Sequence, residues 1–130
     1  MNYFKIKISS IAVSLCFLFS ALSSINPIFY SNWNLYYTGS GTGNHLSQTY
    51  YPPRHDHYRV SCTGINSNGS RICKTKVTCN GVNKGEFTGG GAFLTIDYVG
   101  TARPSIGFSL SSTSGTGPAS MSGTIEYYDN

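Results

Sequence analysis

The alternation of apolar with small polar residues constrains the fold of this chain more than any other feature of its sequence. In segment 105–110, Ile106, Phe108 and Leu110 are separated by single glycine and serine residues. Successive side chains of a β-strand point to opposite faces, so this pattern predicts a strand with one buried face. The same pattern recurs in residues 33–37, 92–98 and 121–127. Beyond residue 23, no stretch has the three- and four-residue apolar spacing of an amphipathic helix.

The segments between these predicted strands are rich in Gly, Ser, Thr and Asn, as turns are. Short strands with one apolar face predict an all-β fold, which we expect to be a small antiparallel β-sandwich, with a small β-barrel as the alternative. Two glycine-rich connections, Thr38–Gly43 and Ser114–Gly117, lack the spacing of a phosphate-binding loop. We interpret them as flexible connections at one end of the sandwich.

The N-terminus has the features of a secretory signal peptide. A short basic start is followed by the uncharged apolar run Ile8–Leu22, and Ala21 and Ser23 are the small residues of a cleavage site. The run is shorter than the roughly 20 residues of a membrane-spanning helix, so we expect no transmembrane segment. The sequence therefore predicts a signal peptide over residues 1–23 and a single secreted domain over residues 24–130, extracellular or periplasmic.

The charge of the predicted mature chain is small. Removal of Lys5 and Lys7 with the signal peptide lowers the 9 basic residues of the full chain to seven, against 5 acidic ones. Dedicated nucleic-acid binders are usually far more basic, so we expect no specific nucleic-acid partner.

Two strand-like runs, 58–65 and 71–79, predict a β-hairpin because Asn66–Gly69 between them is a strong turn signal. Cys62 then lies opposite or diagonal to Cys73 on one face of the hairpin. In an exported chain this arrangement predicts a disulfide between them. Cys79 is left as a free thiol, an alternative partner of Cys62, or a link to a second chain in a homodimer.

The opposite face of this predicted hairpin collects basic side chains. With Tyr58, Val60 and Cys62 directed to the core, the outward set is His55, His57, Arg59, Lys74 and Lys76. No carboxylate belongs to that set, since Asp56 is expected on the other side of the strand or in irregular chain after Pro52-Pro53. These five residues are therefore candidates for binding a phosphate, a sulfate or a lipid headgroup.

The His-x-His spacing of His55 and His57 also permits metal binding, because it places two imidazoles on one strand face. Three nearby cations disfavour a metal ion and no third ligand is evident, so we expect no metal and no cofactor. Acid–base catalysis by either histidine, assisted by Arg59 or Lys76, is an alternative. No motif singles out that chemistry, so we assign no catalytic residue and favour a protein that is not an enzyme.

Three adjacent tyrosine pairs, 36–37, 50–51 and 127–128, each place one ring outside if they lie in strands. Exposed tyrosines beside polar loops are typical of surfaces that bind sugars or proteins. The candidates are Tyr36, Tyr51 and Tyr128, and the alternative is that the tyrosines replace scarce aliphatic residues in the core.

The sequence thus favours a secreted binding module or small effector that recognises a glycan, an acidic surface or another protein. A small secreted histidine-dependent hydrolase of phosphodiester or glycosidic bonds is the second hypothesis. A self-assembling surface or structural protein is the third.

Overall fold

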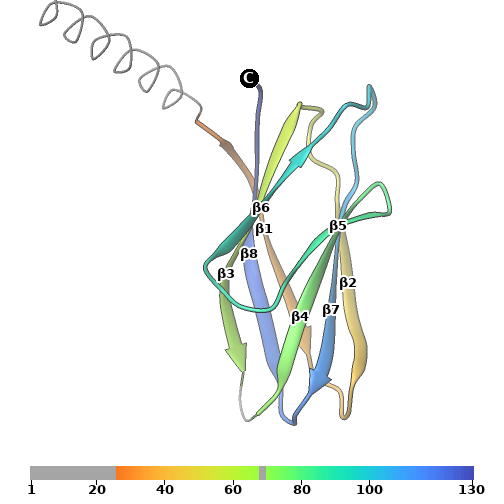
Figure 1. Cartoon of the computed structure of the whole chain (residues 1–130), viewed down its shortest axis with the longest axis vertical. Helices are drawn as coiled ribbons and strands as arrows, with labels where there is room; N and C mark the ends of the chain where they lie inside the picture. The colour runs from red at the N-terminus through yellow and green to blue at the C-terminus, as the bar shows by residue number, and fades with distance from the viewer. Residues whose placement is uncertain (1–25, 68–69) are drawn as a thin grey trace, which may run out of the picture.

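In the part of the chain that the structure describes, eight antiparallel strands form two four-stranded sheets that pack face to face (Figure 1). The computed structural model describes residues 26–67 and 70–130. The strands are β1 (Ile28–Tyr37), β2 (Gly43–Tyr50), β3 (His57–Ser67), β4 (Ile72–Cys79), β5 (Val82–Phe87), β6 (Ala92–Asp97), β7 (Ile106–Ser114) and β8 (Ala119–Tyr128). The predicted signal peptide, Cys16 and the Asn68-Gly69 part of the predicted turn lie outside the described residues.

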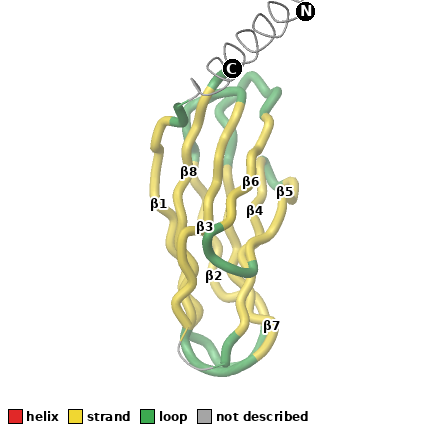
Figure 2. Tube along the Cα trace, turned by 60° about the vertical axis from the view of Figure 1, so that its left-hand side comes forward, coloured by secondary structure: helices red, strands yellow, loops and turns green. Residues whose placement is uncertain are grey.

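Sheet A has the strand order β1-β8-β3-β6, and sheet B has the order β2-β7-β4-β5. The chain crosses from one sheet to the other at every connection except that between β4 and β5. This order is that of a jelly roll, a sandwich built from two Greek keys. The predicted β-sandwich is therefore confirmed over the alternative barrel. In the described residues, most loops lie at the two ends of the strands, and the loop between β5 and β6 crosses the side of the sandwich (Figure 2).

The alternation in the sequence corresponds to the observed burial. Ile106 and Leu110 on β7 and Ile125 on β8 are fully buried, whereas the immediate neighbours of each in the sequence are partly exposed. An aromatic stack joins the two sheets, because Trp33 of sheet A lies parallel to Phe108 of sheet B at a ring-centroid distance of 4.9 Å. The small side chains of the sequence are thus offset by a few large aromatic residues that fill the space between the sheets.

Gly123 is required beside this stack. It pairs with Trp33 across β1 and β8, and the indole nitrogen of Trp33 donates to the Ser61 carbonyl at 3.0 Å. A Cβ atom on Gly123 would lie 1.7 Å from that carbonyl oxygen. Glycine therefore allows the indole to reach the backbone of β3.

The predicted hairpin of residues 58–79 is wrong. β3 pairs with β6 and β8 in sheet A, whereas β4 pairs with β5 and β7 in sheet B. The hairpin instead joins β4 to β5 at Asn80-Gly81, where both residues have positive φ angles of 49° and 80°. Asn-Gly is the preferred pair for such a two-residue turn.

The predicted disulfide between Cys62 and Cys73 is not formed, and the hairpin that was expected to place the two cysteines side by side does not exist. Cys62, Cys73 and Cys79 are buried free thiols, and there is no disulfide in the ranges 26–67 and 70–130. Burial raises the pKa of all three thiols above the ordinary value. Their side chains therefore act as small apolar residues of the core.

Arg71 holds the loops at one end of the sandwich, which we call the arginine end. Its guanidinium donates to the carbonyls of Gly41 (2.6 Å), Gly39 (3.1 Å) and Gly117, and to the Ser112 hydroxyl at 2.8 Å. The side chain is 6% exposed, and no carboxylate in the described chain pairs with it. The guanidinium also lies 4.1 Å from the ring centroid of Tyr37. One buried cation thus fixes both predicted glycine-rich connections.

Replacement of Arg71 by Met is expected to lower the free energy of unfolding by about 3 kcal/mol, because buried carbonyls lose a charged donor. Urea denaturation of both proteins measures the effect. Arg103→Met is the matched control, since Arg103 is exposed and its contact among residues 26–67 and 70–130 is one hydrogen bond to the Pro52 carbonyl at 3.1 Å. We expect this control to change stability by less than about 1 kcal/mol. Equal losses in the two variants would contradict the role of Arg71.

The raised thiol pKa values make stability depend on pH in the alkaline range. Unfolding lets the thiols ionise at their ordinary pKa near 9.0, whereas the folded protein keeps them protonated to higher pH. Their contribution is complete below pH 9 and is lost as the pH rises through the folded-state values. The urea concentration at the unfolding midpoint should therefore decrease as the pH is raised from 8 to 10. Because the thiols are free, a reductant should leave the midpoint at pH 7 unchanged. A midpoint that drops with reductant would contradict the free thiols.

Candidate functional site

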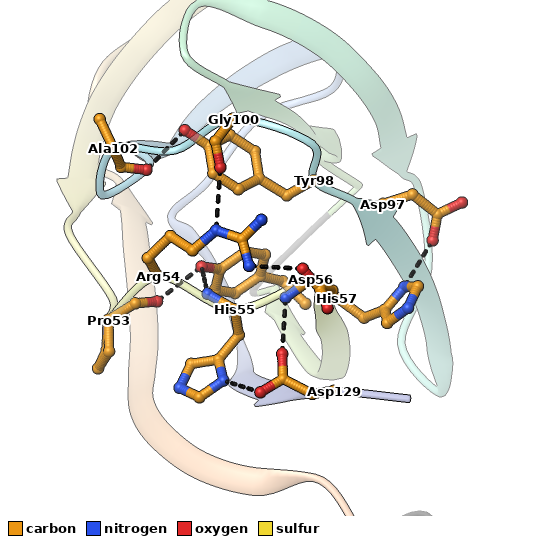
Figure 3. A network of polar contacts seen from close by, with 11 residues as sticks. Pro53, Arg54, His55, Asp56, His57, Asp97, Tyr98, Gly100, Ala102 and Asp129 are labelled. Atoms are coloured by element: carbon orange, nitrogen blue, oxygen red, sulfur yellow. Dashed lines mark hydrogen bonds and ion pairs between the residues drawn. The ribbon is translucent and has the colours of Figure 1, made fainter.

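The end of the sandwich opposite to Arg71, which we call the histidine end, carries a network of polar contacts (Figure 3). Three segments meet there: residues 53–57 before and at the start of β3, residues 97–102 after β6, and Asp129 after β8. The first segment is fixed by Tyr58, whose ring is fully buried. Its hydroxyl donates to the Pro53 carbonyl at 2.6 Å and accepts from the His55 backbone N–H at 2.8 Å.

Two histidine–aspartate pairs are built into this end. Nδ1 of His55 lies 2.8 Å from Asp129 Oδ2, and Nδ1 of His57 lies 2.8 Å from Asp97 Oδ1. A neutral imidazole that donates from Nδ1 presents Nε2 as an acceptor. Each pair therefore holds one imidazole in a fixed tautomer and orientation.

Consecutive tyrosines of β8 support the two imidazoles. His55 stacks on Tyr127 at a ring-centroid distance of 4.1 Å, and His57 stacks on Tyr128 at 5.0 Å. Successive residues of a strand point to opposite faces, so the two histidines lie on opposite sides of β8. Figure 3 shows their rings directed apart. The predicted shared face for His55 and His57 is wrong, because β3 begins only at His57.

Asp129 has a lowered pKa. The main cause is the hydrogen bond from the Asp56 backbone N–H to Asp129 Oδ1 at 2.9 Å, and the contact with His55 contributes next. Both contacts stabilise the ionised carboxylate. The last residues of β8 are in this way connected to the loop before β3.

A hollow of about 410 Å³ opens beside the second histidine–aspartate pair. Arg54 lines it and is held in place, since Nη1 donates to Asp56 Oδ1 at 2.5 Å and Nε donates to the Gly100 carbonyl at 2.9 Å. Tyr98 is held in place because its hydroxyl donates to the Ala102 carbonyl at 2.8 Å. The lining residues are Arg54, Asp56, His57, Asp97, Tyr98 and Val99. We call this site the charged hollow.

The predicted basic face does not exist as one surface. His57 and Arg59 lie on the outer face of sheet A, whereas Lys74 and Lys76 lie on the outer face of sheet B. Carboxylates also neutralise two of these basic side chains. Arg59 Nε lies 3.8 Å from Glu126 Oε2, and Lys74 Nζ lies 3.3 Å from Glu86 Oε2. All five acidic residues of the chain, Asp56, Glu86, Asp97, Glu126 and Asp129, pair with a basic side chain.

The predicted tyrosines are divided between the two ends. Tyr128 meets His57 at the histidine end, and Tyr51 is 57% exposed directly after β2. Tyr36 is 52% exposed near the arginine end of β1. The structure thus brings His57 and Arg59 together on sheet A, where Tyr128 stacks on His57, and Lys74 and Lys76 together on sheet B, but it does not gather the predicted binding residues at one surface.

Sequence reasoning missed Arg54, Asp97, Tyr98 and Asp129 as site residues. Asp97 and Asp129 lie 40 and 74 positions from their histidine partners. No local motif marks such pairs, and only the strand order would have shown them. The sequence offered one weak signal: because it has so few carboxylates, each of them was a candidate site residue.

In comparisons with known proteins, no family model and no curated protein matches the chain. Within the described residues, no cluster of three or more potential metal ligands occurs. The described residues also include no helix long and apolar enough to cross a membrane. The fold and the site define a small jelly-roll domain with a charged hollow at one end.

Replacement of His55 by Ala is expected to raise the pKa of Asp129 part of the way towards its ordinary value of 3.8. The backbone donor of Asp56 remains in the variant, so the return is incomplete. NMR titration of the Asp129 carboxyl carbon measures the change. Because the folded-state pKa is lowered, this pair stabilises the fold above pH 3.8 and loses its effect as the pH falls through the folded value. An unchanged titration curve would show that His55 does not contact Asp129 in solution.

Proposed function

We propose that the protein is an exported, non-enzymatic binding module that recognises a neutral glycan in the charged hollow. The observation that carries the proposal is the balanced set of donors and acceptors there. Arg54 offers N–H donors, whereas Asp56 and Asp97 offer carboxylate acceptors. Sugar hydroxyls both donate and accept hydrogen bonds, so they complement such a mixed set.

The charges of the hollow favour a neutral ligand over an anion. One arginine faces two aspartates, and His57 adds a positive charge only when protonated. A phosphate or sulfate would therefore meet two carboxylates at close range, which is unfavourable. This balance argues against the acidic-surface partner predicted from the sequence.

The apolar part of the hollow suits the C–H face of a sugar ring. The Tyr98 ring is half-buried beside Arg54, and the Val99 side chain is 95% exposed at the rim. Aromatic and aliphatic groups beside a few fixed polar groups are the usual composition of small-ligand sites. A volume of about 410 Å³ also fits a small ligand better than a broad protein interface.

The hydrolase hypothesis keeps one specific observation in its favour. The 2.8 Å contact between His57 Nδ1 and Asp97 Oδ1 is the geometry that orients a general base. A hydrolase would release products from the bound oligosaccharide and lose that activity in His57→Ala. Against assembly through a disulfide of Cys79 stands the burial of that residue, which is 4% exposed.

The test is the binding of maltotriose, cellotriose and mannotriose, compared with heparin, by titration calorimetry. Asp97→Asn removes one charged acceptor and should weaken binding of a neutral oligosaccharide about tenfold or more. The fold should be unaffected, because the Asp97 side chain is 79% exposed.

Glu86→Gln is the matched control, since Glu86 also pairs with a basic side chain but does not line the hollow. We expect it to bind as the unmodified protein does. Binding of heparin alone, or equal effects of the two substitutions, would overturn the proposal.

A further inference from the structure

A second cavity, of about 230 Å³, lies at the arginine end and shares no lining residue with the charged hollow. It forms where the end of β1, the end of β3 and the start of β8 converge. Tyr36, Asn66, Pro118 and Ser120 contribute to its wall. We call it the tyrosine cavity.

The loop beside the tyrosine cavity is held in one conformation before any ligand arrives. Arg71 binds the carbonyl of Gly117, next to Pro118, and the carbonyls of Gly39 and Gly41 on the other loop. Tyr37 adds a hydrogen bond from its hydroxyl to the Gly41 carbonyl at 2.7 Å. A site fixed in this way avoids much of the entropy loss that a flexible loop would suffer on binding.

The wall of the cavity is uncharged. Its described lining combines tyrosine, proline and alanine with the short polar side chains of Thr, Asn and Ser. An ionic ligand would leave water for this site without gaining a counter-charge. The occupant that matches the wall is therefore neutral, with an apolar face and polar edges.

Tyr36 has the orientation that such an occupant needs. The residue is 52% exposed, and its hydroxyl accepts a hydrogen bond from Asn34 Nδ2 at 2.7 Å. The amide donor leaves the hydroxyl hydrogen of Tyr36 able to donate to a ligand. The ring offers a flat apolar surface on which a sugar ring can stack.

We propose that the tyrosine cavity is a second binding site for a single neutral sugar residue, which makes the protein bivalent. This second site rests on the proposed function only in the class of its ligand, a neutral sugar. A volume of about 230 Å³ accommodates one ring better than an extended oligosaccharide. The two sites lie at opposite ends of the sandwich, so one molecule would link two glycan chains.

The experiment is an NMR titration of the ¹⁵N-labelled protein with the methyl glycosides of glucose, galactose, mannose and N-acetylglucosamine. We expect amide shifts at Tyr36 and Ser120 in addition to those around Asp97. Tyr36→Ala should raise the dissociation constant at the tyrosine cavity about tenfold and leave the charged hollow unchanged. Tyr36→Phe keeps the ring and should give a smaller loss.

Tyr51→Ala is the matched control, because Tyr51 is similarly exposed and also belongs to a tyrosine pair but does not line the cavity. Shifts confined to the surroundings of Asp97 would overturn the second site and leave the proposed function standing. Shifts confined to the tyrosine cavity would do the reverse. Shifts at these amides that depend on protein concentration without sugar would assign the cavity to a second copy of the chain, and would overturn the inference.

Discussion

The hydrogen bonds of the buried Arg71 guanidinium are the interaction on which the arginine end of this sandwich depends. The charge has no carboxylate partner in the described chain and is instead surrounded by backbone carbonyls of two glycine-rich loops. These loops have few apolar side chains, so burial alone could not fix them. Four of their glycines have positive φ angles, and a charged donor offsets the conformational freedom that glycine brings.

The loops at the histidine end are also held in place by polar contacts, but of a different kind. There the buried Tyr58 hydroxyl orders the loop before β3, and two histidine–aspartate pairs fasten that loop to β6 and β8. Each pair lies at least half in solvent on its acidic side, so its contribution to stability is modest. Its larger effect is to orient groups around the charged hollow. Every carboxylate has a basic partner, so the acidic charges are neutralised locally. The surface therefore presents individual hydrogen-bond donors and acceptors more than an extended region of negative or positive potential.

The sequence predicted the faces of the strands correctly but not their partners. Alternation depends on local geometry, which is why Trp33, Val60, Val77 and Phe108 were assigned to the buried side. Strand order depends on long-range packing, which the alternation within one strand does not encode. Asn80-Gly81 contained the true hairpin signal, which was overlooked beside Asn66–Gly69. The basic face and the disulfide both depended on that one wrong hairpin, whereas the shared face of His55 and His57 depended on where β3 begins.

Jelly-roll topology explains why the candidate site cannot be found in any single stretch of this sequence. Almost every connection crosses between the sheets, so each end of the sandwich is assembled from loops distant in the chain. The same topology separates the charged hollow from the tyrosine cavity by about the length of a strand. β8 has 10 residues, which corresponds to about 30 Å at 3.3 Å per residue. A trisaccharide cannot span that distance along a rigid sandwich, so two separate trisaccharides would be needed to occupy both sites.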